Sequence, residues 1–169
     1  MRRTTLIPVA LALTSSALSA QSKSSAPPSI QGVWKIAEVV TTGANASTNS
    51  KPQPSLIIFT RRHYSYLSVN SADPRPKFEP AKDPNKLTDA EKIARYEQWS
   101  PFTANAGTYE IKGTTLTRRP VVAKNETVMT TDPPFAQEFK LAGNTLRLIS
   151  KSAPGEPASE TRTKLTRVQ

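Results

Sequence analysis

Apolar and β-branched residues gather in short runs from Ile30 onward, and stretches rich in Gly, Pro and Asn separate these runs. Runs of this length are typical of strands, because a helix needs about 10 or more residues with a helical period. The pattern predicts strands over residues 32–42, 55–60, 63–69, 107–113, 114–122, 135–143, 145–150 and 160–168.

The connections between these runs are mostly too short for anything but a hairpin. Arg61-Arg62 leaves room only for a tight connection, and glycines at Lys112-Gly113 and Gly143-Asn144 permit the positive φ of a tight turn. Consecutive hairpins favour an up-and-down meander, and about eight strands with one buried face remove their free edges by closing. We therefore expect an all-β fold, a single antiparallel up-and-down β-barrel.

Two other β architectures remain alternatives. A β-sandwich usually has long crossovers between its sheets, whereas the second half of this chain has one hairpin after another. A membrane barrel needs outward apolar bands and aromatic girdles, whereas these strands are short, basic and poor in aromatic residues. Both observations favour the closed meander.

One segment between the strands has a helical pattern. Thr88 and Glu91 have the spacing of a capping box, and Pro101 ends the segment TDAEKIARYEQW. Its apolar residues can share one side at helical spacing. The sequence therefore predicts one short inserted helix, which either covers the barrel mouth or packs against the barrel wall.

The N-terminus has the features of a secretory signal peptide over residues 1–20. Arg2 and Arg3 precede a short apolar run, and small residues follow with cleavage expected after Ala17 or Ala20. An anchor helix is the alternative, but the apolar run is far below the roughly 20 residues of a span. We expect an exported protein, periplasmic or secreted, with a disordered leader over 21–29, one barrel domain over 30–169 and no transmembrane segment after cleavage.

The net charge and the absence of cysteine limit which classes of binding partner the protein can have. The formal net charge of +10 falls to +8 when Arg2 and Arg3 are removed, and no cysteine is present. A basic exported protein can contact anionic envelope surfaces. Basic residues are scattered without interleaved aromatic residues, which argues against nucleic-acid binding.

Four segments resemble those of the bacterial lipocalin-like domain proteins. They are Gly32-Val33-Trp34, HYSYLSVN, FTANAGTYEIKGTTLTRRPVVAKN and EFKLAGNTLRL, and the similarity runs in order from about Ile30 to Val168. The resemblance implies a lipocalin-like barrel in which Trp34 plugs the closed end and Arg167 packs on it. Such a contact is a cation–π interaction, which makes both residues structural.

Three residues are candidates for contact with a ligand in the lumen. If Trp34 points inward, a two-residue period puts Glu38 on the same face. A buried carboxylate needs a partner, such as Arg118, or access to the solvated mouth; a bulge or strand end that leaves Glu38 exposed is the alternative. Tyr109 and Phe139 are expected on the inner wall of their strands.

The chain offers little for catalysis or metal binding. His63 is the single histidine, no carboxylate cluster lies near it, and cysteine is absent, so no catalytic residue, metal site or cofactor is predicted. In the strand 63–69, Tyr64 and Tyr66 share one face while Leu67 and Val69 share the other. Either face can be the inner one.

Three functions fit these observations. The first is a barrel that binds a small apolar or amphipathic ligand in its lumen. The second is a barrel enzyme of the isomerase or cyclase type that uses an acid or base in the lumen, such as Glu38 or a tyrosine. The third is an envelope interaction protein that has a filled barrel and no ligand.

Overall fold

A computed structural model describes residues 29–77, 79–130 and 135–168. Its strands and helices are β1 (Gly32–Gly43), β2 (Ser47–Asn49), β3 (Ser55–Phe59), β4 (His63–Val69), α1 (Asp89–Trp99), β5 (Phe102–Lys112), β6 (Thr115–Ala123), α2 (Glu126–Thr130), β7 (Phe135–Ala142), β8 (Thr145–Lys151) and β9 (Ser159–Val168). The eight runs predicted as strands are all strands in the structure.

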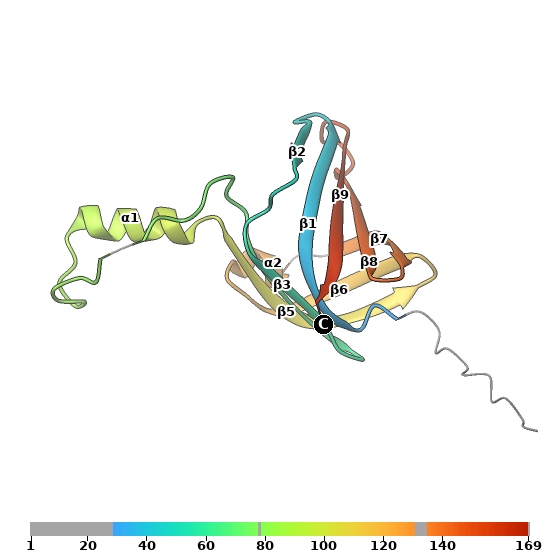
Figure 1. Ribbon diagram of the computed structural model, residues 1–169, viewed down its shortest axis with the longest axis horizontal. Helices are drawn as coiled ribbons and strands as arrows, with labels where there is room; N and C mark the ends of the chain where they lie inside the picture. The colour runs from blue at the N-terminus through green and yellow to red at the C-terminus, as the bar shows by residue number, and fades with distance from the viewer. Residues whose placement is uncertain (1–28, 78, 131–134, 169) are drawn as a thin grey trace, which may run out of the picture.

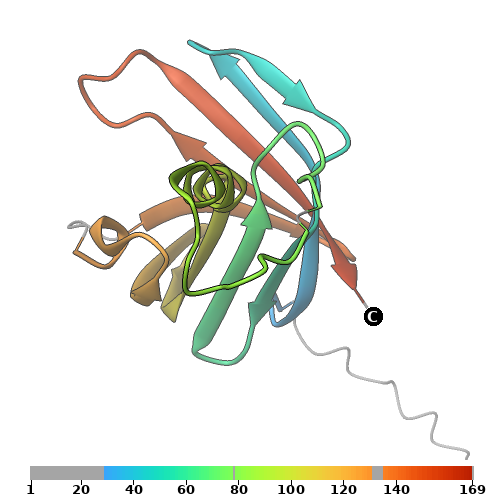
Figure 2. The same ribbon diagram turned by 90° about the vertical axis from the view of Figure 1, so that its left-hand side faces the viewer.

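The sheet is a closed barrel of eight antiparallel strands (Figures 1 and 2). From β3 to β9 each strand pairs with the next one along the chain, and β9 returns to β1, where Trp34 lies opposite Arg167. This closure confirms the up-and-down barrel over the sandwich. The short strand β2, which was expected to be loop, adds to β1 at Val39–Thr41, beyond the part of β1 that β3 covers.

The predicted hairpins are present. β3 pairs with β4 over its whole length, with Ser55 opposite Ser68. Gly113 and Gly143 have φ values of 59° and 54° in the turns before β6 and β8. Glycine reaches this left-handed region without the steric cost that a side chain adds, so these two residues set the register of the hairpins.

The apolar core fills the closed end of the barrel. Its fully buried large side chains point inward from β1, β3, β6, β8 and β9: Trp34, Ile57, Phe59, Leu116, Leu146, Leu148 and Leu165. In β7, Phe139 and Leu141 pack against this core, as the alternation in the sequence predicts. Truncating one such leucine to alanine costs about 2–5 kcal/mol in a packed core.

Cross-strand pairing settles which face of β4 is inner. Tyr64 lies opposite Phe59 on one side and Gly107 on the other, and its side chain is 3% exposed. Side chains of directly paired residues point to the same face of a sheet. Tyr64, Tyr66 and Ser68 therefore face the lumen.

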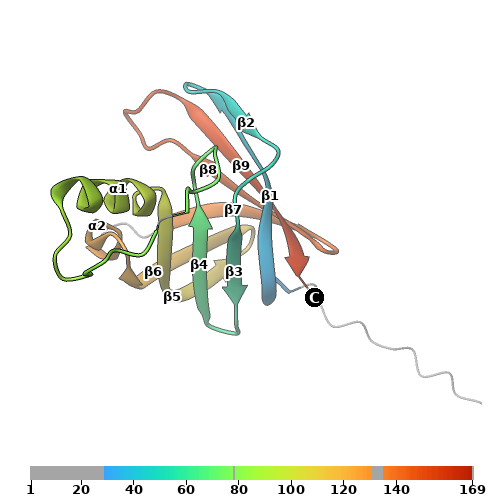
Figure 3. The ribbon, with the colours of Figure 1, turned by 60° about the vertical axis from the view of Figure 1, so that its left-hand side comes forward.

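Helix α1 begins with the predicted capping box. Thr88 Oγ1 accepts a hydrogen bond from the Glu91 amide, and the Glu91 carboxylate accepts one from the Thr88 amide. The helix has no buried residue and stands away from the barrel (Figures 1 and 3). The body of α1 therefore does not pack against the barrel wall, whereas its C-terminal end, at Tyr96 and Ser100, borders the barrel mouth.

A second helix corrects the expectation of one. α2 has five residues, too few to show a helical period in the sequence. It follows Asn125, whose side-chain oxygen accepts a hydrogen bond from the Thr127 amide, and it packs beside β6. Among the described residues, no helix is long and apolar enough to cross a membrane.

Candidate functional site

The interior of the barrel changes character along its axis. Above the apolar core, the inner-face positions carry small or polar side chains: Ser55, Ser68, Asn105, Gln137, Ser150, Thr161 and Thr163. All except Ser68 are only half-buried although they face inward. Solvent therefore reaches the inner wall in this open half, whereas side chains fill the closed half.

Arg118 lies at the boundary between the two halves. It points inward from β6, because its cross-strand neighbours are Tyr109 and Phe135 on the inner face. The guanidinium carbon is 5.4 Å from the centre of the Tyr64 ring and 5.3 Å from the centre of the Tyr66 ring. Both distances fit cation–π contacts, which hold the guanidinium in place.

The polar contacts of Arg118 are incomplete. Its Nη2 donates a hydrogen bond of 2.9 Å to Gln137 Oε1, and the Gln137 amide donates in turn to Ser150. Its Nε is buried and has no hydrogen-bond partner. Protein atoms surround the side chain on nearly all sides, yet part of its surface stays open to solvent. We call Arg118, Tyr64, Tyr66, Gln137 and Ser150 the arginine cluster.

Among the described residues, no carboxylate forms an ion pair with Arg118. Burial lowers the pKa of Arg118, while Tyr64 and Tyr66 act in the opposite direction. A guanidinium remains charged in proteins, so the lumen contains a cation without a counter-charge among the residues that the structure describes.

The hydroxyl of Tyr64 is also unpartnered. Its oxygen is buried and makes no hydrogen bond. Burial raises the pKa of Tyr64, and the nearby Arg118 partly opposes this shift. The phenol therefore stays protonated at neutral pH and can donate a hydrogen bond beside the guanidinium.

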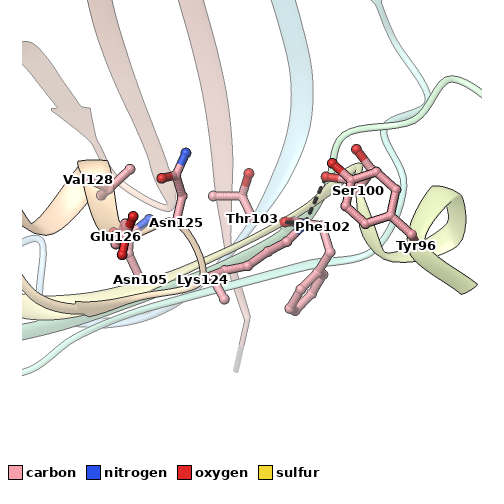
Figure 4. A pocket seen from close by; sticks show the side chains of 10 residues that line it. Tyr96, Ser100, Phe102, Thr103, Asn105, Lys124, Asn125, Glu126 and Val128 are labelled. Atoms are coloured by element: carbon pink, nitrogen blue, oxygen red, sulfur yellow. Dashed lines mark hydrogen bonds between the residues drawn. The ribbon is translucent and has the colours of Figure 1, made fainter. Parts of the chain in front are cut away.

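A hollow of about 530 Å³ opens at the mouth of the barrel, between the end of α1 and the start of α2 (Figure 4). Thr103 and Asn105 line it from β5, and both are inner-face residues. Asn105 lies directly opposite Tyr66, which in turn contacts Arg118. The wall of the hollow is therefore continuous with the arginine cluster.

Lys124 is the cation at the rim of this hollow, but its polar contacts are already made. Its Nζ donates hydrogen bonds to the backbone carbonyls of Trp99, Ser100 and Phe102 (Figure 4). The carbonyls of Trp99 and Ser100 lie at the C-terminal end of α1, where a helix has orphan acceptors and a partial negative charge, and that of Phe102 lies at the start of β5. Lys124 thus fastens α1 to β6, and Arg118 remains the cation available to a ligand.

The expectation that Glu38 faces the lumen is wrong. The register between β1 and β9 shifts between Ile36 and Glu38, where Ala37 is an extra residue. Before this bulge Ile36 lies opposite the buried Leu165, and after it Glu38 lies opposite the outward-facing Lys164. Such a bulge reverses the alternation, so Glu38 is on the outer face and does not pair with Arg118.

Tyr109 and Phe139 do face inward, and they come together at the closed end. Both border a hollow of about 380 Å³ next to Ile30. The Tyr109 ring packs edge-on against Phe59 at 5.3 Å, and its hydroxyl donates a hydrogen bond of 2.6 Å to the Thr60 carbonyl. Their contacts are those of core residues, and the packed core separates this end from the open half.

The contact expected between Trp34 and Arg167 is present. The Arg167 guanidinium carbon lies 4.2 Å from the centre of the Trp34 ring, and Trp34 is fully buried. Arg167 also donates hydrogen bonds to the carbonyls of Ser29 and Gln31, and Trp34 Nε1 donates one of 2.8 Å to the Ile30 carbonyl. These bonds hold the segment before β1 across the closed end.

From the sequence, Arg118 was expected only as a possible partner of Glu38, although the pattern of β6 itself indicates that this arginine faces inward. In the run 114–122, Arg118 has the same parity as Leu116, so the alternation places an arginine on the apolar face. His63, by contrast, is exposed at the start of β4. Within the described ranges, no group of three histidine or acidic side chains could hold a metal ion.

A comparison of the chain with models of known protein families, with curated proteins and with solved structures finds no match. The interior of the barrel is therefore the feature from which a function can be inferred. Its open half offers a solvated wall of polar side chains and one unpaired cation.

Proposed function

We propose that this protein is an exported, lipocalin-like barrel that binds a small amphipathic molecule in the open half of its lumen. Arg118 supports this proposal most directly, because it is deeply enclosed by the barrel and still reached by solvent. A charged side chain in such a place lowers stability unless something compensates it. A bound molecule provides that compensation.

The shape and the lining of the lumen agree with an amphipathic ligand. The hollow at the mouth, about 530 Å³, is within the range of small-molecule sites. Phe102, Tyr96 and Val128 offer apolar surface at its rim, whereas Thr103 and Asn105 offer polar groups toward the interior. A purely apolar ligand would leave Arg118 and the polar wall unpaired.

Export and the lipocalin-like relationship are part of the proposal. The signal peptide and most of the leader, residues 1–28, lie outside the described residues. The arrangement of Trp34 and Arg167 supports the relationship, because it is the one that the resemblance implies. The isomerase or cyclase alternative loses Glu38, which is outside the lumen, and keeps the inward-facing tyrosines as its candidate groups.

Native mass spectrometry of the protein purified from its own host tests the binding function. We expect a mass above that of the denatured chain, because a lumen ligand is carried through purification. The denatured mass also tests export, since cleavage after Ala17 or Ala20 gives two defined values. A native mass equal to the denatured mass in every charge state would argue against a carried ligand.

A variant pair locates the ligand. Thr163 is a half-buried inner-face residue of the open half, and Lys164 beside it faces outward. Thr163→Trp places a large ring in the lumen and should remove the extra mass, whereas Lys164→Trp adds the same ring outside and should keep it. Equal retention in both variants would place the ligand elsewhere.

A row of basic residues on the outer wall supports a second function, contact with an anionic envelope surface. Lys140, Arg147 and Lys164 are direct neighbours across β7, β8 and β9. Glu38 on β1 lies opposite Lys164 at the end of this row, so Arg147 is the member that lies between two like charges. Like charges directly opposite each other destabilise a sheet, so an anionic partner relieves their repulsion. Sedimentation with phosphatidylglycerol vesicles should therefore exceed that with phosphatidylcholine vesicles, and Arg147→Met should reduce it.

A further inference from the structure

We infer that the lumen ligand carries a single oxyanion group, such as a carboxylate or a sulfate, that binds at the guanidinium of Arg118 with the Tyr64 hydroxyl as a second donor. This inference rests on the proposed binding function and specifies the chemistry of its deepest contact. It concerns the arginine cluster, whose Arg118 Nε and Tyr64 hydroxyl are both buried without partners.

The available donors define how the anion binds. Two tyrosine rings lie against the guanidinium, and Gln137 accepts from its Nη2. The Nε–H remains free in the described structure, and the Tyr64 phenol lies beside the same guanidinium. An oxyanion accepts several hydrogen bonds at once, and bonds to a charged donor are the strongest of this kind. A ligand with a neutral carbonyl would accept a hydrogen bond from one of these donors, but it would leave the positive charge of Arg118 without a counter-charge.

The charge balance limits the anion to one negative charge. Among the inner-face positions of the described strands, the charged residues are Arg118 and Arg167. Arg167 lies at the closed end, over Trp34 and bonded to two backbone carbonyls. Arg118 therefore faces the open half alone, and a ligand with one negative charge neutralises it, whereas a dianion would bring a second charge without a partner.

The route to the cluster runs through the open half. Asn105 lines the mouth hollow and neighbours Tyr66, and Tyr66 contacts Arg118. Part of the Arg118 surface is open to solvent, whereas its Nε and the Tyr64 hydroxyl are covered, so the anion reaches these two donors only when the side chains that cover them shift. The body of the ligand then lies along the half-buried inner wall, with its far end toward Phe102.

Two fluorescent dyes with the same aromatic framework test the inference. 8-Anilinonaphthalene-1-sulfonate carries one negative oxyanion, and N-phenyl-1-naphthylamine lacks it. We expect the sulfonate to bind the wild-type protein roughly 10- to 100-fold more tightly, the factor that a charge-assisted hydrogen bond contributes. Thr163→Trp should reduce the binding of both dyes, because it fills the lumen.

Substitutions at the cluster separate the anion contact from general charge. Arg118→Met should abolish the preference for the sulfonate, measured as the ratio of the two dye affinities, and Arg118→Lys should restore part of this preference. Arg119→Met is the matched control, because Arg119 is the next residue, faces outward and pairs with Glu110. Circular dichroism shows whether each variant keeps the strand content of the barrel.

The outcomes distinguish the inference from the function on which it rests. If both dyes bind in the lumen with equal affinity, or if Arg119→Met weakens the sulfonate as much as Arg118→Met does, the anion contact is wrong and the binding function stands. If neither dye responds to Thr163→Trp, the lumen is not the binding site, and both proposals fail. If Arg118→Met does not fold, Arg118→Lys and Tyr64→Phe decide the result, because retention of the full sulfonate preference in both would contradict the contact.

Discussion

The buried Tyr64 and the half-buried Tyr109 predict opposite effects of the same substitution. Tyr64 and Tyr109 both place their rings against the core. The Tyr109 hydroxyl donates to the Thr60 carbonyl at 2.6 Å, whereas the Tyr64 hydroxyl is buried without a partner. Replacing either residue with phenylalanine keeps the ring and removes only the hydroxyl. The change in the free energy of unfolding therefore reports whether that hydroxyl is paired.

The magnitudes follow from the cost of hydrogen bonds. A buried polar group without a partner costs about 1–3 kcal/mol, so Tyr64→Phe should stabilise the barrel by up to this amount. A paired hydroxyl contributes about 0.5–1.5 kcal/mol net, so Tyr109→Phe should destabilise it by that much. For a domain of this size, about 1 kcal/mol corresponds to roughly 4 °C in Tm.

Urea unfolding followed by far-ultraviolet circular dichroism measures both changes. The slope of the free energy of unfolding against urea concentration should stay the same in both variants, because the surface exposed on unfolding is unchanged. Tyr64→Phe should also weaken binding of the sulfonate dye, so that a more stable protein is a poorer binder. If Tyr64→Phe destabilises the barrel as much as Tyr109→Phe does, the Tyr64 hydroxyl has a partner and the reasoning fails.

Three further predictions concern the closed end and the pH dependence. Arg167→Met should lower the free energy of unfolding by about 1–3 kcal/mol in urea titrations, because it removes the contact with Trp34 and the bonds to two backbone carbonyls; an unchanged midpoint would contradict this. Gly32→Ala should lower Tm more than Gly113→Ala, since both have positive φ but a Cβ at Gly32 collides with the Arg167 guanidinium, whereas at Gly113 it meets open space. Burial raises the pKa of Tyr64, so the folded protein keeps a proton that the unfolded chain releases near pH 10. The contribution of Tyr64 to the free energy of unfolding should therefore be constant below about pH 10 and fall as the pH rises through the raised pKa. In urea titrations from about pH 8 to 11, Tyr64→Phe should reduce that fall.

The local pattern of the sequence determined the strands, the hairpins and the capped helix. Strand runs, the turn glycines Gly113 and Gly143, and the capping box of Thr88 and Glu91 each depend on a few neighbouring residues. Local conformational preferences act on the same residues in any fold, so these features can be predicted from the sequence. The inward position of Phe139 followed in the same way, because the alternation in β7 is regular.

The composition of the lumen was decided by the tertiary structure. One extra residue at Ala37 moved Glu38 to the outer face, and only the pairing of β1 with β9 reveals it. Which face of β4 turned inward likewise depended on its partners in β3 and β5. The alternation in β6 marked Arg118, but its isolation from carboxylates and its two tyrosine neighbours come from other strands. A strand pattern fixes which residues share a face, whereas the neighbouring strands decide what that face meets.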